Sequence, residues 1–176
     1  MAHQQQFDFV RSVVSIYPNN FKSATVLEVG SLDINGSVRQ FFQDCNYTGI
    51  DLGEGKGVDV VCNGQDYNAN DNTFDTCISC ECFEHNPEWV ATFANMHRMV
   101  KPSGLIVMSC ATTGRAEHGT KRTSPSDAPF CGDYYKNLTE QDFVDNFDLN
   151  AMFSIYVFGV GAATRDLYFY GIKKLL

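Results

Sequence analysis

The feature that most constrains the fold of this chain is a regular alternation between short apolar segments and segments with helical periodicity. Apolar side chains recur at intervals of three and four, as on one face of a helix, in residues 6–17, 38–45 and 86–100. Apolar runs of strand length, bounded by polar turns, lie at 25–30, 47–51, 58–62, 74–79 and 105–109. This alternation predicts an α/β fold with a mainly parallel sheet and helices on both faces.

The last part of the chain departs from this alternation. Thr139 is followed three residues later by Asp142, a spacing that predicts a capped short helix with Phe143 on its buried side. Two strands are then expected at about 150–158 and 165–173, with no helix between them. They should therefore pair as an antiparallel hairpin at one edge of the sheet.

The composition is that of one globular domain. The 176 residues are 44% hydrophobic and 19% charged, and a chain of this length can fold without disulfides or a structural metal. Its 13 basic and 21 acidic residues give a net charge of −8. Because phosphate backbones and anionic membranes select basic surfaces, this charge argues against duplex nucleic acid and membrane surfaces as partners. We therefore expect residues 1–176 to form a single domain.

Neither a membrane span nor a secretory signal is expected. The longest apolar stretch is 155–163, well short of the roughly 20 residues that cross a bilayer, and the first six residues lack a basic segment followed by an apolar one. The seven cysteines are therefore predicted to be free thiols in a reducing cytoplasm. No metal is expected, because Cys77 and Cys80 would point to opposite faces of a strand.

The residues that suggest chemistry follow the first two predicted strands. Ligands of open α/β sheets bind outside the carboxyl ends of the strands. Gly30 lies at such an end, where a glycine lets a ligand approach the backbone. Asp51, 21 residues later, can accept hydrogen bonds from ribose hydroxyls. The glycine spacing does not fit a dinucleotide cradle, so an adenosine without a diphosphate is favoured. Asp75 lies at the opposite end of its strand and is predicted to be a structural cap.

In this order, the segments resemble the class I methyltransferases that use S-adenosylmethionine, especially the small bacterial type 11 kind. Residues 28–30 look like the start of that family's E-x-G-x-G-x-G loop, and Asp51 looks like its ribose-binding acid. Residues 74–85 are similar to its fourth motif and residues 105–109 to its fifth strand. The resemblance covers residues 24–110 and most of the remainder, and it implies a Rossmann-like fold.

The loop after the first strand departs from the family pattern. Leu32 and Ile34 stand where the family has its later glycines, and Gly36 comes two positions further on. This loop is therefore expected to curve differently around the methionine part of the cofactor.

The resemblance implies S-adenosylmethionine as the cofactor and assigns its parts to residues. Glu28 and Gly30 would lie under the methionine moiety, Asp51 would hold the ribose, and Leu52 would pack on the adenine. Carboxylates in this region favour a cationic ligand such as a sulfonium. The residues expected around the cofactor are Glu28, Gly30, Ser31, Leu32, Asp33, Gly36, Asp51, Leu52, Asn63, Gln65, Cys80 and Glu81.

The sequence says less about the methyl acceptor. Methyl transfer from a sulfonium is an in-line displacement. Alignment of the reactants can lower its activation barrier by roughly 7–11 kcal/mol, and a general base typically raises the rate about 10²–10⁴-fold. If the acceptor is a hydroxyl, His85 and His118 are the expected catalytic bases, with a structural role as the alternative for each.

Residues 111–135 interrupt the alternation and are predicted to form a substrate lid, since a loop this long is usually functional or disordered. Arg115, Lys121 and Arg122 give its first half an excess of positive charge. Together with Tyr134 they are expected to bind the substrate, with the basic groups gripping a carboxylate or phosphate. Ordinary solvated charges are the alternative.

The predicted function is methyl transfer from S-adenosylmethionine to a small-molecule acceptor at oxygen or nitrogen, with an anionic group on the acceptor as one option. A non-catalytic binding protein of the same fold is the main alternative, and a nicotinamide oxidoreductase is a third. Asn86-Pro87 is followed by Glu88 and not by the proline and aromatic residue of amino-directed DNA methyltransferases, which argues against a nucleobase substrate.

Overall fold

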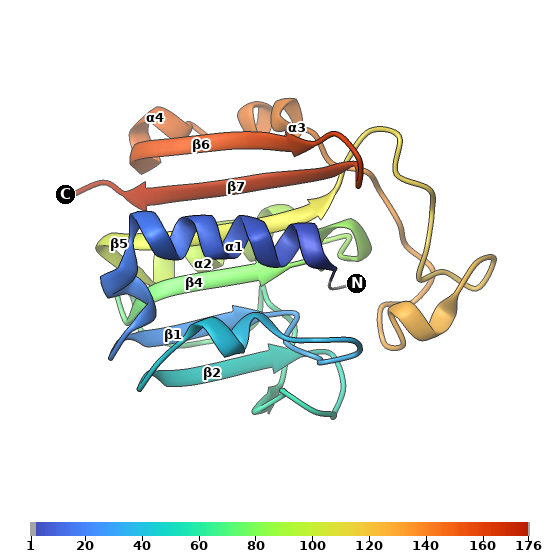
Figure 1. Cartoon of the computed structure of the whole chain (residues 1–176), viewed down its shortest axis with the longest axis horizontal. Coiled ribbons are helices and arrows are strands. Elements are labelled where there is room, and N and C mark those ends of the chain that lie inside the picture. The colour runs from blue at the N-terminus through green and yellow to red at the C-terminus, as the bar shows by residue number, and fades with distance from the viewer. Residues whose placement is uncertain (1–2, 176) are drawn as a thin grey trace.

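Seven strands form one sheet in the computed structural model, which describes residues 3–175 (Figure 1). The strands are β1 (Thr25–Val29), β2 (Asn46–Asp51), β3 (Val60–Val61), β4 (Phe74–Cys80), β5 (Val100–Ala111), β6 (Phe153–Gly161) and β7 (Asp166–Lys173). Their order across the sheet is β3-β2-β1-β4-β5-β7-β6. The first five are parallel, and β7 runs antiparallel between β5 and β6. The predicted parallel sheet with an antiparallel hairpin at one edge is confirmed.

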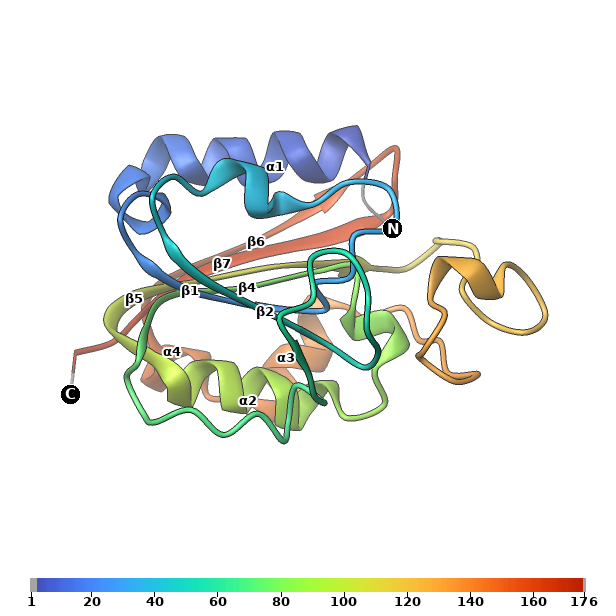
Figure 2. The same cartoon turned by 90° about the horizontal axis from the view of Figure 1, so that it is seen from below.

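Helices cover both faces of the sheet, as predicted. Figure 2 shows α1 and the short η2 on one face, and α2, α3 and α4 on the other. The α-helices are α1 (Gln4–Ile16), α2 (Trp89–Met99), α3 (Glu140–Asn146) and α4 (Leu149–Met152). Short 3-10 helices are η1 (Pro18–Phe21), η2 (Val38–Phe41), η3 (Phe83–His85) and η4 (Pro125–Asp127).

Each face of the sheet has its own apolar core. On the α1 face, Val10 and Val13 pack with Val26 and Leu105 of the sheet, and all four are fully buried. On the α2 face the core is aromatic and centres on Phe93 of α2, which contacts the rings of Phe83, Phe143, Phe147, Phe153 and Phe169. Burial on both faces fixes the register of the strands and therefore the position of their carboxyl ends.

The helix predicted over 38–45 is wrong in length. Only η2 forms, and Phe42 is already extended at φ −97° and ψ 126°. Asp44 then adopts a φ of +53°, which no α-helix allows. The apolar spacing is nevertheless used, because Val38 is buried in the core of this face and Phe42 contacts Phe21 and Tyr47. Tertiary packing of aromatic residues thus overrides a helical pattern that is only two turns long.

Other boundaries differ in smaller ways. The stretch 150–158 begins as the short helix α4, because Asp148 accepts a hydrogen bond from the amide of Ala151, and β6 starts only at Phe153. α2 begins at Trp89 with Glu88 as its N-cap, three residues after the start of the helical segment predicted over 86–100, and Asn86 accepts a hydrogen bond from the Glu88 amide. β5 starts at Val100 rather than at 105.

Two predicted caps are confirmed. Thr139 and Asp142 form a reciprocal capping box at the start of α3. Asp75 accepts hydrogen bonds from the amide and hydroxyl of Thr25 and pairs with Lys101 at 2.7 Å, so it ties three neighbouring strand segments together. Among residues 3–175, no helix has the length and apolar character needed to cross a membrane.

Candidate active site

A cavity of about 380 Å³ opens at the carboxyl ends of β1, β2 and β4, a size that suits a small-molecule ligand. It is lined by segments that follow these strands, by the start of α1 and by part of the long loop between β5 and α3. The lining residues are Gln6, 28–32, 34–38, 50–52, 62–65, 80–82, 85–88 and 127–132. The cavity therefore lies at the sheet edge where ligands of open α/β sheets bind.

β1 ends in a turn that requires glycine. Gly30 has a φ of +81°, and a Cβ at this position would lie 2.6 Å from the Cβ of Cys82. The amides of Gly30 and Ser31 both donate to the carbonyl oxygen of Ile50, at 2.9 and 3.1 Å. These bonds tie the loop after β1 to β2 and bring its backbone against the cavity.

Asp51 lies at the end of β2 and organises both neighbouring loops. Its Oδ2 accepts a hydrogen bond from the amide of Leu32 at 2.9 Å, and its Oδ1 accepts one from the amide of Leu52 at 2.7 Å. Burial raises the pKa of Asp51, while the two amide bonds oppose that rise. Each carboxylate oxygen can accept a second hydrogen bond, so the group has capacity left for two hydroxyls in the cavity.

Glu28 is a buried carboxyl group in the wall of the cavity. Its Oε2 accepts a hydrogen bond from the hydroxyl of Tyr47 at 2.8 Å, and 4% of the residue is exposed. Burial raises the pKa of Glu28 to about 8, against the opposing effect of the Tyr47 hydrogen bond. A cation in the cavity would favour the ionised form of this carboxyl group.

The turn after β4 brings a third carboxyl group, that of Glu81, to the cavity. Glu81 adopts a φ of +54°, which is uncommon for a residue with a side chain and typical of functional sites. It is held by two hydrogen bonds with Ser109 of β5: the Glu81 amide donates to the Ser109 carbonyl at 2.8 Å, and the Ser109 hydroxyl donates to Oε1 at 2.9 Å. Cys80 lies beside it in the lining, and burial raises the pKa of its thiol to about 12.

All but one of the residues expected around the cofactor line the cavity. Leu52, which is 40% exposed, lines the cavity together with Asn63 and Gln65 from the loop after β3. The exception is Asp33. Its carboxylate accepts a hydrogen bond from the amide of Gly36 and pairs with Lys56 at 2.6 Å, so it braces the loop from outside the lining.

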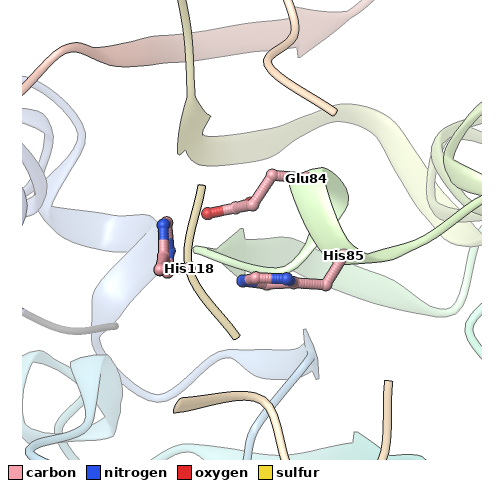
Figure 3. Close-up of side chains that lie close together, drawn as sticks. All are labelled: Glu84, His85 and His118. Carbon is pink, nitrogen blue, oxygen red and sulfur yellow. The ribbon is translucent and has the colours of Figure 1, made fainter. Parts of the chain in front are cut away.

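His85 and His118, the expected bases, are brought together beside Glu84 (Figure 3). The two imidazole rings meet edge to face with centroids 5.0 Å apart. Of the three residues only His85 lines the cavity. Burial, followed by the neighbouring His118, lowers the pKa of His85 to about 4, and burial also lowers the pKa of His118. Burial and the nearby Glu81 raise the pKa of Glu84 to about 8.

The basic residues expected to grip a substrate lie outside the lining. Arg115 donates to the carbonyl of Thr164 and pairs with the buried Asp166 at 3.2 Å. Arg122 is exposed and pairs with Glu117 at 2.8 Å. Lys121 is exposed and Tyr134 half-buried, and neither lines the cavity. The basic groups of the two arginines are thus already neutralised within the protein.

The sequence analysis missed several lining residues. Gln6 is 2% exposed and lies on the same helix face as Val10 and Val13, where a polar residue in an apolar stripe was a usable signal. In the long loop, residues 127–132 line the cavity, and the ring of Phe130 packs so closely on Gly53 that a Cβ there would lie 2.5 Å from it. No local pattern marks Phe130 for this contact, because it depends on how the loop folds back.

The cavity is acidic. Its lining holds five carboxyl groups and, among the residues that the structure describes, no lysine or arginine. The acids are Glu28, Asp51, Glu81, Glu88 and Asp127. Such a lining favours cationic or neutral ligands over anionic ones.

The chain matches a protein family described as "Methyltransferase domain" (Methyltransf_11) over residues 23–108. No curated protein sequence matches it. Among solved structures, it is similar to the 1,6-didemethyltoxoflavin-N1-methyltransferase of Burkholderia thailandensis, bound to 1,6-didemethyltoxoflavin and S-adenosylhomocysteine. The TM-score is 0.67 at 16% identity, over 97% of this chain and 79% of that one.

Two further structures share the fold. One is phosphoethanolamine N-methyltransferase 2 of Haemonchus contortus in complex with S-adenosyl-L-methionine, with a TM-score of 0.69 and 13% identity over 96% of this chain. This chain spans about half of that enzyme, 52%. The other is the N-methyltransferase NodS of Bradyrhizobium japonicum, with a TM-score of 0.61 and 14% identity over 97% and 95% of the two chains. Residues 23–108 thus match the methyltransferase-domain family, and the seven-stranded Rossmann-like sheet is the fold of these solved methyltransferases.

Proposed function

We propose that this protein transfers the methyl group of S-adenosylmethionine to a nitrogen or oxygen atom of a small molecule that is neutral or positively charged. The observation that carries the proposal is the acidic cavity at the ends of β1, β2 and β4, which Glu28, Gly30 and Asp51 enter from adjacent strands.

The cofactor would lie along the loops after β1 and β2. The free hydrogen-bonding capacity of Asp51 suits the two ribose hydroxyls, and the exposed Leu52 suits the adenine ring, with Asn63 and Gln65 near its edge. The ammonium and sulfonium groups would lie toward Glu28 and Glu81, whose carboxylates favour positive charge.

The acceptor would lie between His85 and residues 127–132, on the other side of the sulfonium. Residues 127–132 of the long loop line the cavity, which supports a role for this loop as a substrate lid. The low pKa of His85 keeps its imidazole neutral, so the ring can take a proton from the acceptor, with His118 beside it. The acidic lining and the internal pairing of Arg115 and Arg122 give an anionic acceptor no support.

The direct test is calorimetric binding of S-adenosylhomocysteine, followed by methyl transfer from labelled S-adenosylmethionine to a library of neutral, cationic and anionic small molecules. We expect binding that Asp51→Ala removes and that Glu54→Ala, an exposed acid outside the lining, leaves unchanged. NAD should not bind. Cofactor binding without transfer to any acceptor would favour a non-catalytic binding protein, and transfer only to anionic acceptors would refute the charge preference.

A further inference from the structure

Five buried polar atoms without hydrogen-bond partners meet at one point of the structure. They are both carboxylate oxygens of Glu84, both ring nitrogens of His85 and Nε2 of His118. None makes a hydrogen bond of standard geometry within residues 3–175, although weaker backbone interactions, of Tyr134 with His85 and of Ala111 with Glu84, reach them. Glu84 is fully buried and His85 is 3% exposed. Because roughly nine in ten buried polar groups in proteins are hydrogen-bonded, such a concentration points to a ligand that satisfies these atoms together.

The three side chains face a common space. Figure 3 shows the Glu84 carboxylate and the His85 ring, both carried by η3, directed toward the His118 ring of the long loop. One ligand atom from each of the three lies within 4.8 Å of the others. Ligands bound to Zn²⁺ at about 2.0–2.2 Å lie roughly 3.4 Å apart in a tetrahedron, so the widest pair would need to close by at most about 1.4 Å.

The long loop holds His118 in the tautomer that can bind a metal. Its Nδ1 lies 3.1 Å from the carbonyl oxygen of Ala116, which can only accept, so Nδ1 carries the proton and the lone pair is on Nε2. A backbone carbonyl on the other ring nitrogen is the usual support of a metal-binding histidine. The next residue, Gly119, has a φ of +70°, and a Cβ there would lie 2.6 Å from Cε1 of His85, so the loop packs directly on the second ligand.

The donor set selects the kind of ion. Two imidazoles and one carboxylate suit divalent transition metals such as Zn²⁺ or Fe²⁺, whereas Mg²⁺ and Ca²⁺ prefer oxygen ligands alone.

A second group of possible ligands, His3, Glu81 and Asp166, has the same span but different surroundings. Asp166 there already pairs with Nε2 of His3 at 2.9 Å and with Arg115 at 3.2 Å. Its charge is thus neutralised within the protein, which makes this group a useful comparison and not the site we infer.

We propose that Glu84, His85 and His118 form a binding site for one divalent transition-metal ion, with Zn²⁺ as its representative, which ties the long loop between β5 and α3 to η3 at the cavity wall. An ion there would occupy the His85 lone pair, so the general-base role proposed for the metal-free protein applies only without it.

The test is competition between metal-stripped protein and a chromophoric chelator for Zn²⁺, followed by Co²⁺ substitution. We expect one Zn²⁺ per chain, no competition for Mg²⁺, and a Co²⁺ spectrum without the charge-transfer band that thiolate ligands give. Glu84→Gln and His118→Ala should each weaken Zn²⁺ binding at least about 100-fold, since even loss of a supporting group costs roughly 10–100-fold. His3→Ala, in the comparison group, should leave it unchanged.

Circular dichroism checks that each variant is folded, and His118→Gln replaces His118→Ala if the latter is not. The proposal is overturned by the absence of a tightly bound Zn²⁺, by a thiolate band with Co²⁺, or by binding that survives in folded Glu84 and His118 variants. Loss of binding in His3→Ala alone would assign the ion to the other group. None of these measurements needs S-adenosylmethionine, so a failed methyl-transfer assay leaves the result intact.

Discussion

The two sides of the cavity are built on different principles. On the cofactor side, the loops after β1 and β2 are locked by backbone hydrogen bonds, such as the two amides that Asp51 binds and the two that the Ile50 carbonyl accepts. On the acceptor side, η3 and the long loop bring together Glu84, His85 and His118, five of whose buried polar atoms make no standard hydrogen bond within residues 3–175. Backbone bonds give a site that is complete before its ligand arrives, whereas unsatisfied side chains give one that its ligand completes.

The largest expected effect is a loss of turnover that leaves cofactor binding unchanged. Such a result would show that the two sides of the cavity act independently. In metal-stripped protein, His85→Gln should lower kcat about 10²–10⁴-fold, the usual contribution of a general base. Binding of S-adenosylhomocysteine should not change, because the ring lies on the acceptor side. Steady-state kinetics together with calorimetry measure both quantities. If cofactor binding falls in step with kcat, the two sides are not independent.

A backbone change should break the cofactor side alone. Gly30→Ala places a Cβ at a φ of +81° and 2.6 Å from the Cβ of Cys82, so it should cost roughly 1–3 kcal/mol of unfolding free energy and weaken cofactor binding. Urea denaturation gives the stability change. Gly132→Ala is a matched control, since Gly132 has a φ of +65° but no atom within 4 Å of the added Cβ. Equal losses in both variants would mean that the close contact with Cys82 is unimportant.

Most of the cofactor side could be predicted from the sequence, because its geometry is local. Gly30 and Asp51 follow apolar strands directly, and parallel pairing then places both at one edge of the sheet. The acceptor side depends on the long loop, whose path no periodicity describes. Arg115 was expected in the substrate site from charge alone, yet its partner Asp166 is 51 residues away. The importance of Glu84 became visible only when folding buried it beside two histidines.

The pH dependence of the unfolding free energy should show the cost of ionising the buried carboxyl groups. With folded pKa values near 8 against about 4.5 in the unfolded chain, Glu28 and Glu84 keep protons that the unfolded chain has lost, so stability falls as the pH rises to about 8 and then levels off. Glu28→Gln should make the fall in Tm between pH 6.5 and 8 smaller by several degrees, because each kcal/mol of unfolding free energy corresponds to roughly 2–4 °C in Tm. Glu54→Gln should keep the full slope, and an unchanged slope in Glu28→Gln would indicate that Glu28 is ionised in the free protein.

The smallest expected effect concerns the basic residues of the long loop. Arg122 is exposed and pairs with Glu117, and such a pair contributes about 0–1 kcal/mol. Arg122→Ala should therefore leave cofactor binding, KM and Tm nearly unchanged. Arg115→Ala is the informative partner, because it removes a cation from the buried Asp166 and should lower Tm while KM stays the same. A rise in KM for an anionic acceptor in either variant would mean that the loop turns its basic side chains into the cavity when substrate binds. The acceptor side would then change its structure on substrate binding, unlike the cofactor side.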